Sequence, residues 1–354
     1  MTRILIATDA WHPQVNGVVR TLEMTAQILR RLGHTVEVIE PGAYPAVPVP
    51  FYPEIQVCYP RPGRIYDRIR RFRPDSVHIS TEGTIGILVR KYCRSRRWHF
   101  STSYHTRYPE YLRELAGVPE RFTYRFLRWF HGRSSPLMVA TPSLEKELGE
   151  RGFRSPLRRW SRGVDLTIFR PRPKQPVPYP RPVLLYVGRV SHEKNIEDFL
   201  RLTTPGTKVV VGDGPARAEL MRKYPNTVFL GYRKGEELGE IYSSADLFVF
   251  PSKTDTFGIV VIEALASGLP VAAYPATGPI DTITHEKLGA LDHDLGRAVE
   301  RALKTGDPAA CAAEGKTYTW ENCTNQFLQN LVHVSATENP FPSRVTTPVT
   351  CPVG

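Results

Sequence analysis

Hydrophobic residues in the first 140 positions alternate between short β-branched runs and stretches with helical spacing. Residues 3–8 predict a strand, residues 19–32 a helix that ends at Gly33, and residues 35–39 a second strand. This order is typical of a βαβ unit with parallel strands. It is repeated further along, with strands expected at 76–79, 99–103 and 137–140 and a helix at 84–97. The Pro-rich residues 41–62 are expected to form a loop.

A second Pro-rich run, residues 171–182, holds six prolines and predicts a linker between two domains, because proline cannot donate to a helix or a sheet. The α/β pattern then resumes, with strands expected at 183–187, 208–211, 227–230, 247–250 and 270–274. A last helix is expected near residues 320–332, followed by a disordered Pro-containing tail, residues 335–354. Two α/β halves around a linker predict a cleft between them, which is a usual place for a ligand.

The composition indicates a globular protein of 354 residues with a strongly uneven charge. Residues 1–180 hold 30 Lys and Arg against 15 Asp and Glu, whereas residues 181–354 hold 17 against 20. In the first half 27 of the basic residues are Arg, whose side chain suits bidentate phosphate contacts. This asymmetry favours an anionic partner, either nucleic acid or a membrane surface, because charge that served only solubility would not require it.

Several classes of protein are disfavoured by the sequence. The cysteines form no CxxC pair, which argues against a disulfide framework or a structural zinc site. No apolar run approaches the roughly 18 residues of a membrane span. The apolar stretch at the N-terminus is too short for a signal peptide. These features predict a cytosolic protein.

The first chemistry-bearing stretch follows the strand expected at 183–187. Gly188 would let the backbone approach a ligand, and Arg189 and Lys194 place two cations near a helix start at Asn195. Helix N-termini favour anions, so the stretch outlines a diphosphate site. An ordinary β–α turn with surface charges explains the same residues equally well.

Residues 251–271 are more specific. A strand leads into a loop with one acid, Asp255; Phe257 and Gly258 then open a helix, and a second acid, Glu263, follows eight residues after the first. The helix around Glu263 is otherwise apolar and offers no base one turn away. A buried carboxylate without partners is costly, so a polar ligand is the favoured explanation for Glu263.

This stretch resembles the P-S-x-x-E-x-F-G-x-x-x-x-E-A-M/L-A-x-G-x-P-V signature of the retaining, nucleotide-sugar-dependent glycosyltransferases of family 4, with Asp255 at the first acid. The resemblance spans residues 3–333 and is nearest to bacterial and plastid lipid glycosyltransferases, such as sulfoquinovosyl-, mannosyl- and glucosyl-diacylglycerol synthases. It implies the GT-B fold, an α/β architecture with two Rossmann-like domains facing a cleft. Residues 1–170 would bind the acceptor, residues 183–319 would bind the nucleotide sugar, and the last helix would pack back on the first domain.

The resemblance also implies roles for single residues. Glu263 would hold the ribose hydroxyls, Asp255 would face the donor sugar, and His105 in Ser103–Thr106 would be the active-site histidine. Arg189 and Lys194 would neutralise the diphosphate, and Gly188 would allow its close approach. Gly17 would meet the diphosphate or the acceptor, and the Phe257–Gly258 backbone would hold the donor sugar, with Ile259 also in the donor-binding set. The catalytic set is thus His105, Asp255, Arg189 and Lys194.

The acceptor side rests on residues 107–133. Arg121, Arg125 and Arg128 form a basic stripe at helical spacing, and an aromatic stripe lies one residue later at Phe122, Phe126 and Trp129. A helix with paired stripes of this kind suits an anionic membrane surface. A core helix with a solvated Arg edge is the alternative, and the basic residues 64–73 would add to the same face in the first case.

Asp292 and Asp294 match the D-x-D pattern of a metal site, but they precede a helical run, so a helix cap is the favoured interpretation and no metal or cofactor is expected. The expected activity is retaining transfer of a hexosyl group from a UDP-linked sugar to a membrane lipid, diacylglycerol, by an enzyme peripheral to the inner face of the cytoplasmic membrane. Transfer from GDP-mannose or UDP-glucose to a soluble or polyprenyl-linked glycan is the alternative. An Arg-rich nucleic-acid binder would explain the charge but not the acid pair, and a sugar-nucleotide epimerase would need no acceptor.

Overall fold

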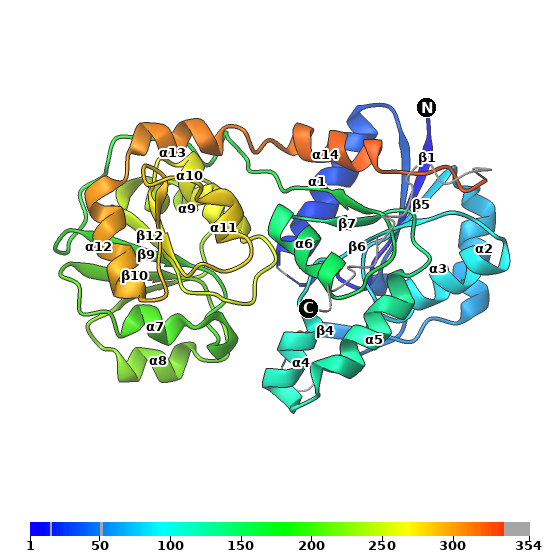
Figure 1. The fold of residues 1–354 in the computed structure, drawn as a ribbon, viewed down its shortest axis with the longest axis horizontal. Helices are drawn as coiled ribbons and strands as arrows, with labels where there is room; N and C mark the ends of the chain where they lie inside the picture. The colour runs from blue at the N-terminus through cyan, green and yellow to red at the C-terminus, as the bar shows by residue number, and fades with distance from the viewer. Residues whose placement is uncertain (15, 50–51, 336–354) are drawn as a thin grey trace, which may run out of the picture.

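The computed structural model describes residues 1–14, 16–49 and 52–335, which form two α/β units side by side (Figure 1). The N-terminal unit holds a six-stranded parallel sheet in the order β2-β1-β5-β6-β7-β8. Its strands are β1 (Arg3–Ala7), β2 (Thr35–Ile39), β5 (Ser76–Ile79), β6 (Ser101–Ser103), β7 (Leu137–Val139) and β8 (Leu157–Arg159). The βαβ order expected for this half is confirmed; β8 was not predicted.

Six helices belong to this unit: α1 (Gly17–Arg31), α2 (Pro62–Phe72), α3 (Thr84–Ser95), α4 (Tyr108–Ala116), α5 (Glu120–His131) and α6 (Pro142–Glu150). Helix α1 begins where the Asn16 side chain accepts hydrogen bonds from the backbone N–H groups of Val18 and Val19. Its apolar face, which includes Leu22 and Leu29, is buried against the sheet strand β1. The N-terminus of α1 is therefore fixed at the edge of the unit where the strands end.

The loop expected at residues 41–62 is wrong in part. The segment contains a short 3₁₀ turn, η1 (Pro41–Ala43), and an antiparallel ribbon of β3 (Ala46–Val49) and β4 (Tyr52–Cys58). A two-stranded ribbon leaves one edge of each strand unpaired, and a proline facing that edge costs no ladder hydrogen bond. Pro48, opposite Gln56, is thus compatible with a strand in this setting.

The C-terminal unit repeats the design with a second six-stranded parallel sheet, in the order β11-β10-β9-β12-β13-β14. The strands are β9 (Val183–Val187), β10 (Thr207–Val211), β11 (Val228–Gly231), β12 (Leu247–Phe250), β13 (Val271–Ala273) and β14 (Gly289–Leu291). The helical segments are η2 (His192–Lys194), α7 (Ile196–Leu200), α8 (Arg217–Lys223), α9 (Gly235–Ser244), α10 (Ile259–Ala266), α11 (Pro279–Thr282), α12 (Leu295–Thr305) and α13 (Pro308–Gly315).

The chain passes between the units twice. Residues 171–182 contain no helix or strand and lead into β9. Helix α14 (Trp320–Gln329) returns to the N-terminal unit and lies along α1 (Figure 1). Its Trp320 and Phe327 are buried in the same apolar cluster as Ile6 of β1.

Two expectations concern the ends and the membrane. The tail expected to be disordered lies, from residue 336 onward, outside the described residues. Within the described part of the chain, no helix has both the length and the apolar character needed to cross a bilayer.

Candidate active site

Two helix N-termini meet between the units. Helix α10 begins after Gly258, whose φ of +82° disfavours a side chain and at which a Cβ would lie 3.0 Å from the Phe250 ring. At the start of α1, a Cβ added to Gly17 would lie 3.1 Å from Cδ1 of Ile259. The two helix dipoles, and the N-terminus of α10, which has no side-chain cap, make such a junction favourable for an anion. Three residues singled out from the sequence, Gly17, Gly258 and Ile259, are therefore brought together.

Glu263 lies one turn into α10, with 2% of its surface exposed. Arg20 of α1 donates from Nη1 to its Oε1 at 2.5 Å, and Tyr242 of α9 donates from Oη to its Oε2 at 3.2 Å. Burial and the Glu263 charge raise the pKa of Tyr242, which keeps its hydroxyl protonated as a donor. Helix α10 has no basic residue that could pair with Glu263, and Arg20 of the N-terminal unit, 243 residues earlier, supplies this partner.

Asp255 and Lys194 form a second ion pair at this place. Lys194 Nζ donates to both carboxylate oxygens of Asp255, at 2.9 and 3.0 Å. Burial opposes the charge on Asp255, but Lys194 outweighs it and holds the pKa of this carboxyl below its ordinary value. Two residues predicted to act on neighbouring parts of one donor are therefore direct neighbours.

The turn after β9 differs from its expected form. Lys194 ends the 3₁₀ turn η2, and Asn195, in the left-handed conformation, separates it from the five-residue α7. Gly188 packs against Gly212, where a Cβ would lie 1.9 Å from the Gly188 carbonyl oxygen. The described contacts of Gly188 are therefore with the neighbouring strand end, and Arg189 follows it with its carbonyl accepting from Tyr186 Oη at 2.7 Å.

His105 is buried two residues after β6, with both ring nitrogens engaged. Its Nε2 lies 2.8 Å from Ser103 Oγ, and Arg162 Nη2 donates to its Nδ1 at 2.9 Å. Burial, followed by the Arg162 charge, lowers the pKa of His105 well below its ordinary value. The backbone carbonyl of His105 accepts from Thr256 Oγ1 at 2.8 Å, next to the buried Phe257, so the histidine adjoins the loop before α10.

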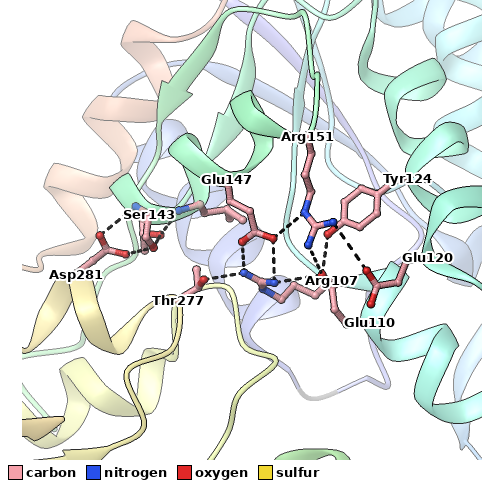
Figure 2. A network of polar contacts seen from close by, with 11 residues as sticks. Arg107, Glu110, Glu120, Tyr124, Ser143, Glu147, Arg151, Thr277 and Asp281 are labelled. Carbon is pink, nitrogen blue, oxygen red and sulfur yellow. Dashed lines mark hydrogen bonds and ion pairs between the residues drawn. The ribbon is translucent and has the colours of Figure 1, made fainter. Parts of the chain in front are cut away.

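A polar network joins the two units around Arg107, which follows His105 by two residues in the sequence (Figure 2). Arg107 donates to Thr277 Oγ1 of the C-terminal unit at 2.7 Å and pairs with Glu110 and Glu147 of its own unit. The backbone N–H of Ser143 on α6 donates to Asp281 of α11 at 3.1 Å, and its hydroxyl donates to the same carboxylate. A Cβ on Gly278 would lie 2.4 Å from the Phe257 carbonyl oxygen, so this network abuts the start of α10.

Two acids that sequence reasoning missed lie on the same edge of the N-terminal sheet as His105. Asp9 follows β1 and accepts from Thr81 Oγ1 at 2.9 Å and from the Ile85 N–H at 2.8 Å; burial raises its pKa although these hydrogen bonds oppose the change. Glu82 follows β5 and lies 3.1 Å from His131 Nε2. The signal that could have found them is their place just past the carboxyl ends of parallel strands, where α/β proteins bind ligands.

The segment expected to hold the paired stripes forms two helices, α4 and α5. On α5 the aromatic stripe faces solvent: Phe122 is 56% exposed, Phe126 38% and Trp129 50%. The core face is formed by other residues, among them Leu127 and Phe130. The core-helix alternative is therefore wrong for these aromatics, and the exposed basic stripe beside them consists of Arg121, Arg125 and Arg128.

The stripes of α5 are not part of the junction at α10. Helix α5 lies on the N-terminal unit, away from α10 (Figure 1). In the basic segment 64–73, Arg68 pairs with Glu37 and Arg70 with Asp67, so part of its charge is neutralised. At the D-x-D sequence, Asp294 caps α12 by accepting from the Gly296 and Arg297 N–H groups, which confirms the predicted cap.

Comparisons with known proteins identify the family. A model described as Glycosyltransferase Family 4 matches residues 15–168, and one described as Glycosyl transferases group 1 matches residues 169–309. A GDP-mannose-dependent alpha-mannosyltransferase of Mycobacterium tuberculosis is 32% identical over 345 residues, 88% of this chain and 90% of that protein. The chain belongs to the group 1 glycosyltransferases. This confirms the predicted family and the predicted enzyme class.

Two further matches bear on this glycosyltransferase. An alpha-monoglucosyldiacylglycerol synthase of Streptococcus pneumoniae is 26% identical, over 85% of this chain and 78% of that protein. The structure of a sucrose-phosphate synthase from Thermosynechococcus elongatus superposes with a TM-score of 0.75 and 20% identity, over 93% of this chain and 98% of that one. The second match confirms the predicted fold, two Rossmann-like units in the GT-B arrangement.

Proposed function

We propose that this glycosyltransferase moves a hexosyl group from a nucleotide diphosphate sugar to a membrane lipid, with retention at the anomeric carbon. The observation that carries the donor half is the junction of the α1 and α10 N-termini, flanked by Lys194 and by the buried Glu263. The helix N-termini favour a diphosphate. Glu263 already has the partners Arg20 and Tyr242, but its carboxylate can accept further hydrogen bonds from hydroxyl groups. The site needs no metal or cofactor in this proposal, because cations of the chain neutralise the diphosphate.

Each donor group has a matching residue in this arrangement. The diphosphate would lie at the helix junction with Lys194 and Arg189, and Glu263 would accept from the ribose hydroxyls. Asp255 would face the sugar from beside Lys194, whose two hydrogen bonds hold it ionised. Glu263, Asp255 and Lys194 would then contact the donor in addition to their present hydrogen-bond partners.

The reaction would proceed on one face of the sugar without an enzyme nucleophile. The bond between the anomeric carbon and the diphosphate oxygen breaks, the acceptor hydroxyl oxygen forms the new bond from the same side, and its proton passes to the departing diphosphate. The chain contributes positioning and charge stabilisation, from Lys194 and Arg189 and from the two helix N-termini. His105, whose pKa is lowered by burial, would stay neutral and line the sugar side.

The acceptor half is carried by α5. Three exposed aromatics beside three exposed arginines form a surface that can insert rings into a bilayer and attract anionic lipid headgroups. An enzyme bound in this way would be peripheral, on the inner face of the cytoplasmic membrane. The likeness to a monoglucosyldiacylglycerol synthase supports diacylglycerol or a glycosylated diacylglycerol as the acceptor.

One observation favours a second candidate. The mycobacterial relative, with 32% identity over most of both chains, is named for GDP-mannose, so mannosyl transfer from GDP-mannose to a lipid-linked or soluble glycan is the alternative. The identity of the donor, meaning its nucleotide base and its sugar, can be tested independently of the identity of the acceptor.

The test is a matrix of donors and acceptors. Purified protein is incubated with UDP-glucose, UDP-galactose or GDP-mannose, each with diacylglycerol in anionic vesicles, with a soluble oligosaccharide, or with no acceptor. We expect released nucleotide diphosphate and a glycolipid with one donor only in the presence of vesicles. Transfer to the oligosaccharide alone would overturn the lipid acceptor, and turnover without any acceptor would indicate epimerisation or hydrolysis instead.

A further inference from the structure

Arg162 is an unusual residue in the N-terminal unit. It lies between β8 and the linker, it is 5% exposed, and its described hydrogen bonds include no carboxylate. Nη1 donates to the carbonyl oxygens of Trp160 at 2.7 Å and Ser161 at 2.9 Å, and Nη2 donates to His105 Nδ1 at 2.9 Å. A buried cation is costly, so a sequence that keeps one here has a use for it.

The contact between Arg162 and His105 determines where the ring proton lies. A guanidinium can only donate hydrogen bonds, so Nδ1 of His105 must accept and cannot carry a proton. The proton of the neutral ring then lies on Nε2, and it is donated to Ser103 Oγ at 2.8 Å. The opposite tautomer would set two N–H groups against each other at 2.9 Å.

The same reasoning runs on into the sheet. Ser103 Oγ, having accepted from His105, has one proton to donate, either to His78 Nε2 at 3.1 Å or to the Ser80 carbonyl oxygen at 3.4 Å. If the proton goes to His78, His78 carries its own proton on Nδ1 and donates to Ser101 Oγ at 2.9 Å, which in turn donates to the Val77 carbonyl oxygen at 3.5 Å. Arg162, which cannot accept, therefore fixes the direction of the hydrogen bonds as far as Ser103.

We propose that Arg162 is a positioning residue that locks His105 as a neutral imidazole with its proton on Nε2 and thereby holds the His105 backbone where Thr256 of the C-terminal unit reaches it. The inference rests on the proposed function only in that His105 adjoins the donor sugar. Within it, His105 serves transfer as a fixed hydrogen-bonding wall of the cleft and exchanges no proton during the reaction.

The surroundings of His105 agree with a neutral ring. The charged or titratable groups that face it are Arg162, His78 and His131, and the Trp160 ring packs edge-on at 5.4 Å between centroids. None of these carries a negative charge. Burial also lowers the pKa of Arg162 to about 10, which still leaves it charged near neutral pH. The Arg162 charge therefore faces a ring that cannot gain a second proton cheaply.

The decisive experiment observes the ring nitrogens directly. Protein labelled with ¹⁵N in histidine is examined by NMR for two-bond couplings from ring nitrogens to ring carbon-bound protons, and the His105 signals are assigned by their loss in His105→Gln. We expect a protonated Nε2 and an unprotonated Nδ1 at pH 7 in the wild type. We expect Arg162→Met to lose this pattern, giving the other tautomer or a mixture, and Arg162→Lys, which also only donates, to restore it.

Activity provides the second readout. Arg162→Met should lower kcat at least roughly tenfold with donor KM little changed, as do changes to outer hydrogen-bond partners of functional histidines elsewhere. Arg162→Lys should recover most of the loss. Arg154→Met, the same change at an exposed arginine of the same unit, is the matched control and should change neither readout.

The outcomes are separable. A wild-type His105 with its proton on Nδ1, or an unchanged tautomer in Arg162→Met, overturns the proposal whatever the activity. A changed tautomer with unchanged kcat overturns the positioning role. If the wild type transfers no sugar with any donor, the proposed function fails while the NMR result still decides the tautomer. Circular dichroism of Arg162→Met identifies unfolding, in which case Arg162→Gln is measured in its place; its amide can accept as well as donate, so it removes the obligatory donor and should give a mixture of tautomers.

Discussion

The two units of this glycosyltransferase have nearly the same architecture but present their functional residues in opposite ways. In the C-terminal unit, the residues that meet at the junction are close together in sequence, because Asp255, Phe257, Gly258 and Glu263 fall within nine positions. Lys194, at the end of η2, contacts this segment through its ion pair with Asp255. In the N-terminal unit, Gly17, His105 and Arg162 come from three distant segments. A contiguous segment can be recognised as a motif, whereas residues that meet only through folding cannot.

The units also differ in what they bury and expose. Within the described residues, all buried histidines lie in the N-terminal unit, at His78, His105 and His131. The same unit exposes the aromatic and basic stripes of α5. The two units therefore differ in the residues that they bury and expose, although their sheets are alike.

The largest effect is expected in the C-terminal unit. Glu263→Ala and Lys194→Ala should each lower kcat/KM at least roughly 100-fold, because each removes a charge-assisted contact to the donor. Initial rates over a range of donor concentrations give the value, and Glu300→Ala on the exposed face of α12 is the control. If calorimetry detects binding of neither UDP nor GDP to the wild type, the donor site is assigned wrongly.

A smaller but clear loss is expected for the histidine of the N-terminal unit. His105→Ala should fold normally and lose transfer, roughly tenfold or more, because the ring no longer holds in place the His105 backbone, whose carbonyl accepts from Thr256. Steady-state kinetics and a melting curve measure the two properties. Unchanged kinetics would mean that His105 has a purely structural role. The N-terminal unit would then contribute no histidine to the transfer.

The third prediction concerns the surface that only the N-terminal unit carries. Reversing charge at Arg121, Arg125 and Arg128 to Glu should abolish flotation with anionic vesicles while donor binding stays intact, since each Arg contributes on the order of 1 kcal/mol near such a surface. Neutral vesicles and competing duplex DNA are included. Equal flotation of the triple variant would remove α5 from the membrane contact, and tight DNA binding without flotation would remove the lipid acceptor.

Acidification should destabilise the N-terminal unit before the C-terminal unit. Burial lowers the pKa of His78 from 6.5 to about 3, so its protonation favours the unfolded state, and each pH unit below 6.5 costs about 1.4 kcal/mol of unfolding free energy until about pH 3. Stability is therefore present above pH 6.5 and declines as pH falls. Hydrogen exchange at pH 7 and pH 5, corrected for intrinsic rates, should show lost protection in the N-terminal sheet first; equal loss in both sheets would contradict this.

The last prediction is that removal of metal ions has no effect on the transfer rate. Because Lys194 and Arg189 neutralise the diphosphate in the proposed function and Asp294 serves as a helix cap, excess EDTA should leave the transfer rate unchanged. Rates before and after chelation, with Mn²⁺ or Mg²⁺ added back, make the measurement. A strict requirement for either ion would assign a new role to Asp292 and Asp294.

Much of the fold could be predicted from the sequence because parallel strands buried on both faces leave strong apolar runs, such as Leu247–Phe250. The ribbon of β3 and β4 could not, because its strands contain the prolines that usually exclude strand structure. Several of the proposed donor residues, from Asp255 to Glu263, could be predicted from one segment. The partner of Glu263 did not, since Arg20 reaches it only after the two units come together.

The N-terminal site shows the limit most clearly. Nothing in the sequence near His105 indicates that its ring is engaged by Arg162, 57 residues later. Asp9 was passed over because it belongs to no motif, although its place after a strand is informative. Contacts between residues far apart in the sequence leave no local pattern. Only the expected carboxyl ends of the parallel strands could have reduced the number of candidate site residues.

The return of α14 to the N-terminal unit has a consequence for how the chain is made. Trp320 and Phe327 complete the apolar cluster around Ile6, so the first unit to leave the ribosome lacks part of its interior until the last helix has been synthesised. The C-terminal unit needs no segment beyond α13 for its own sheet and can close earlier. We therefore expect the order of completion during translation to be the reverse of the order of synthesis, and a released chain truncated before Trp320 to contain a folded second unit beside a protease-sensitive first one.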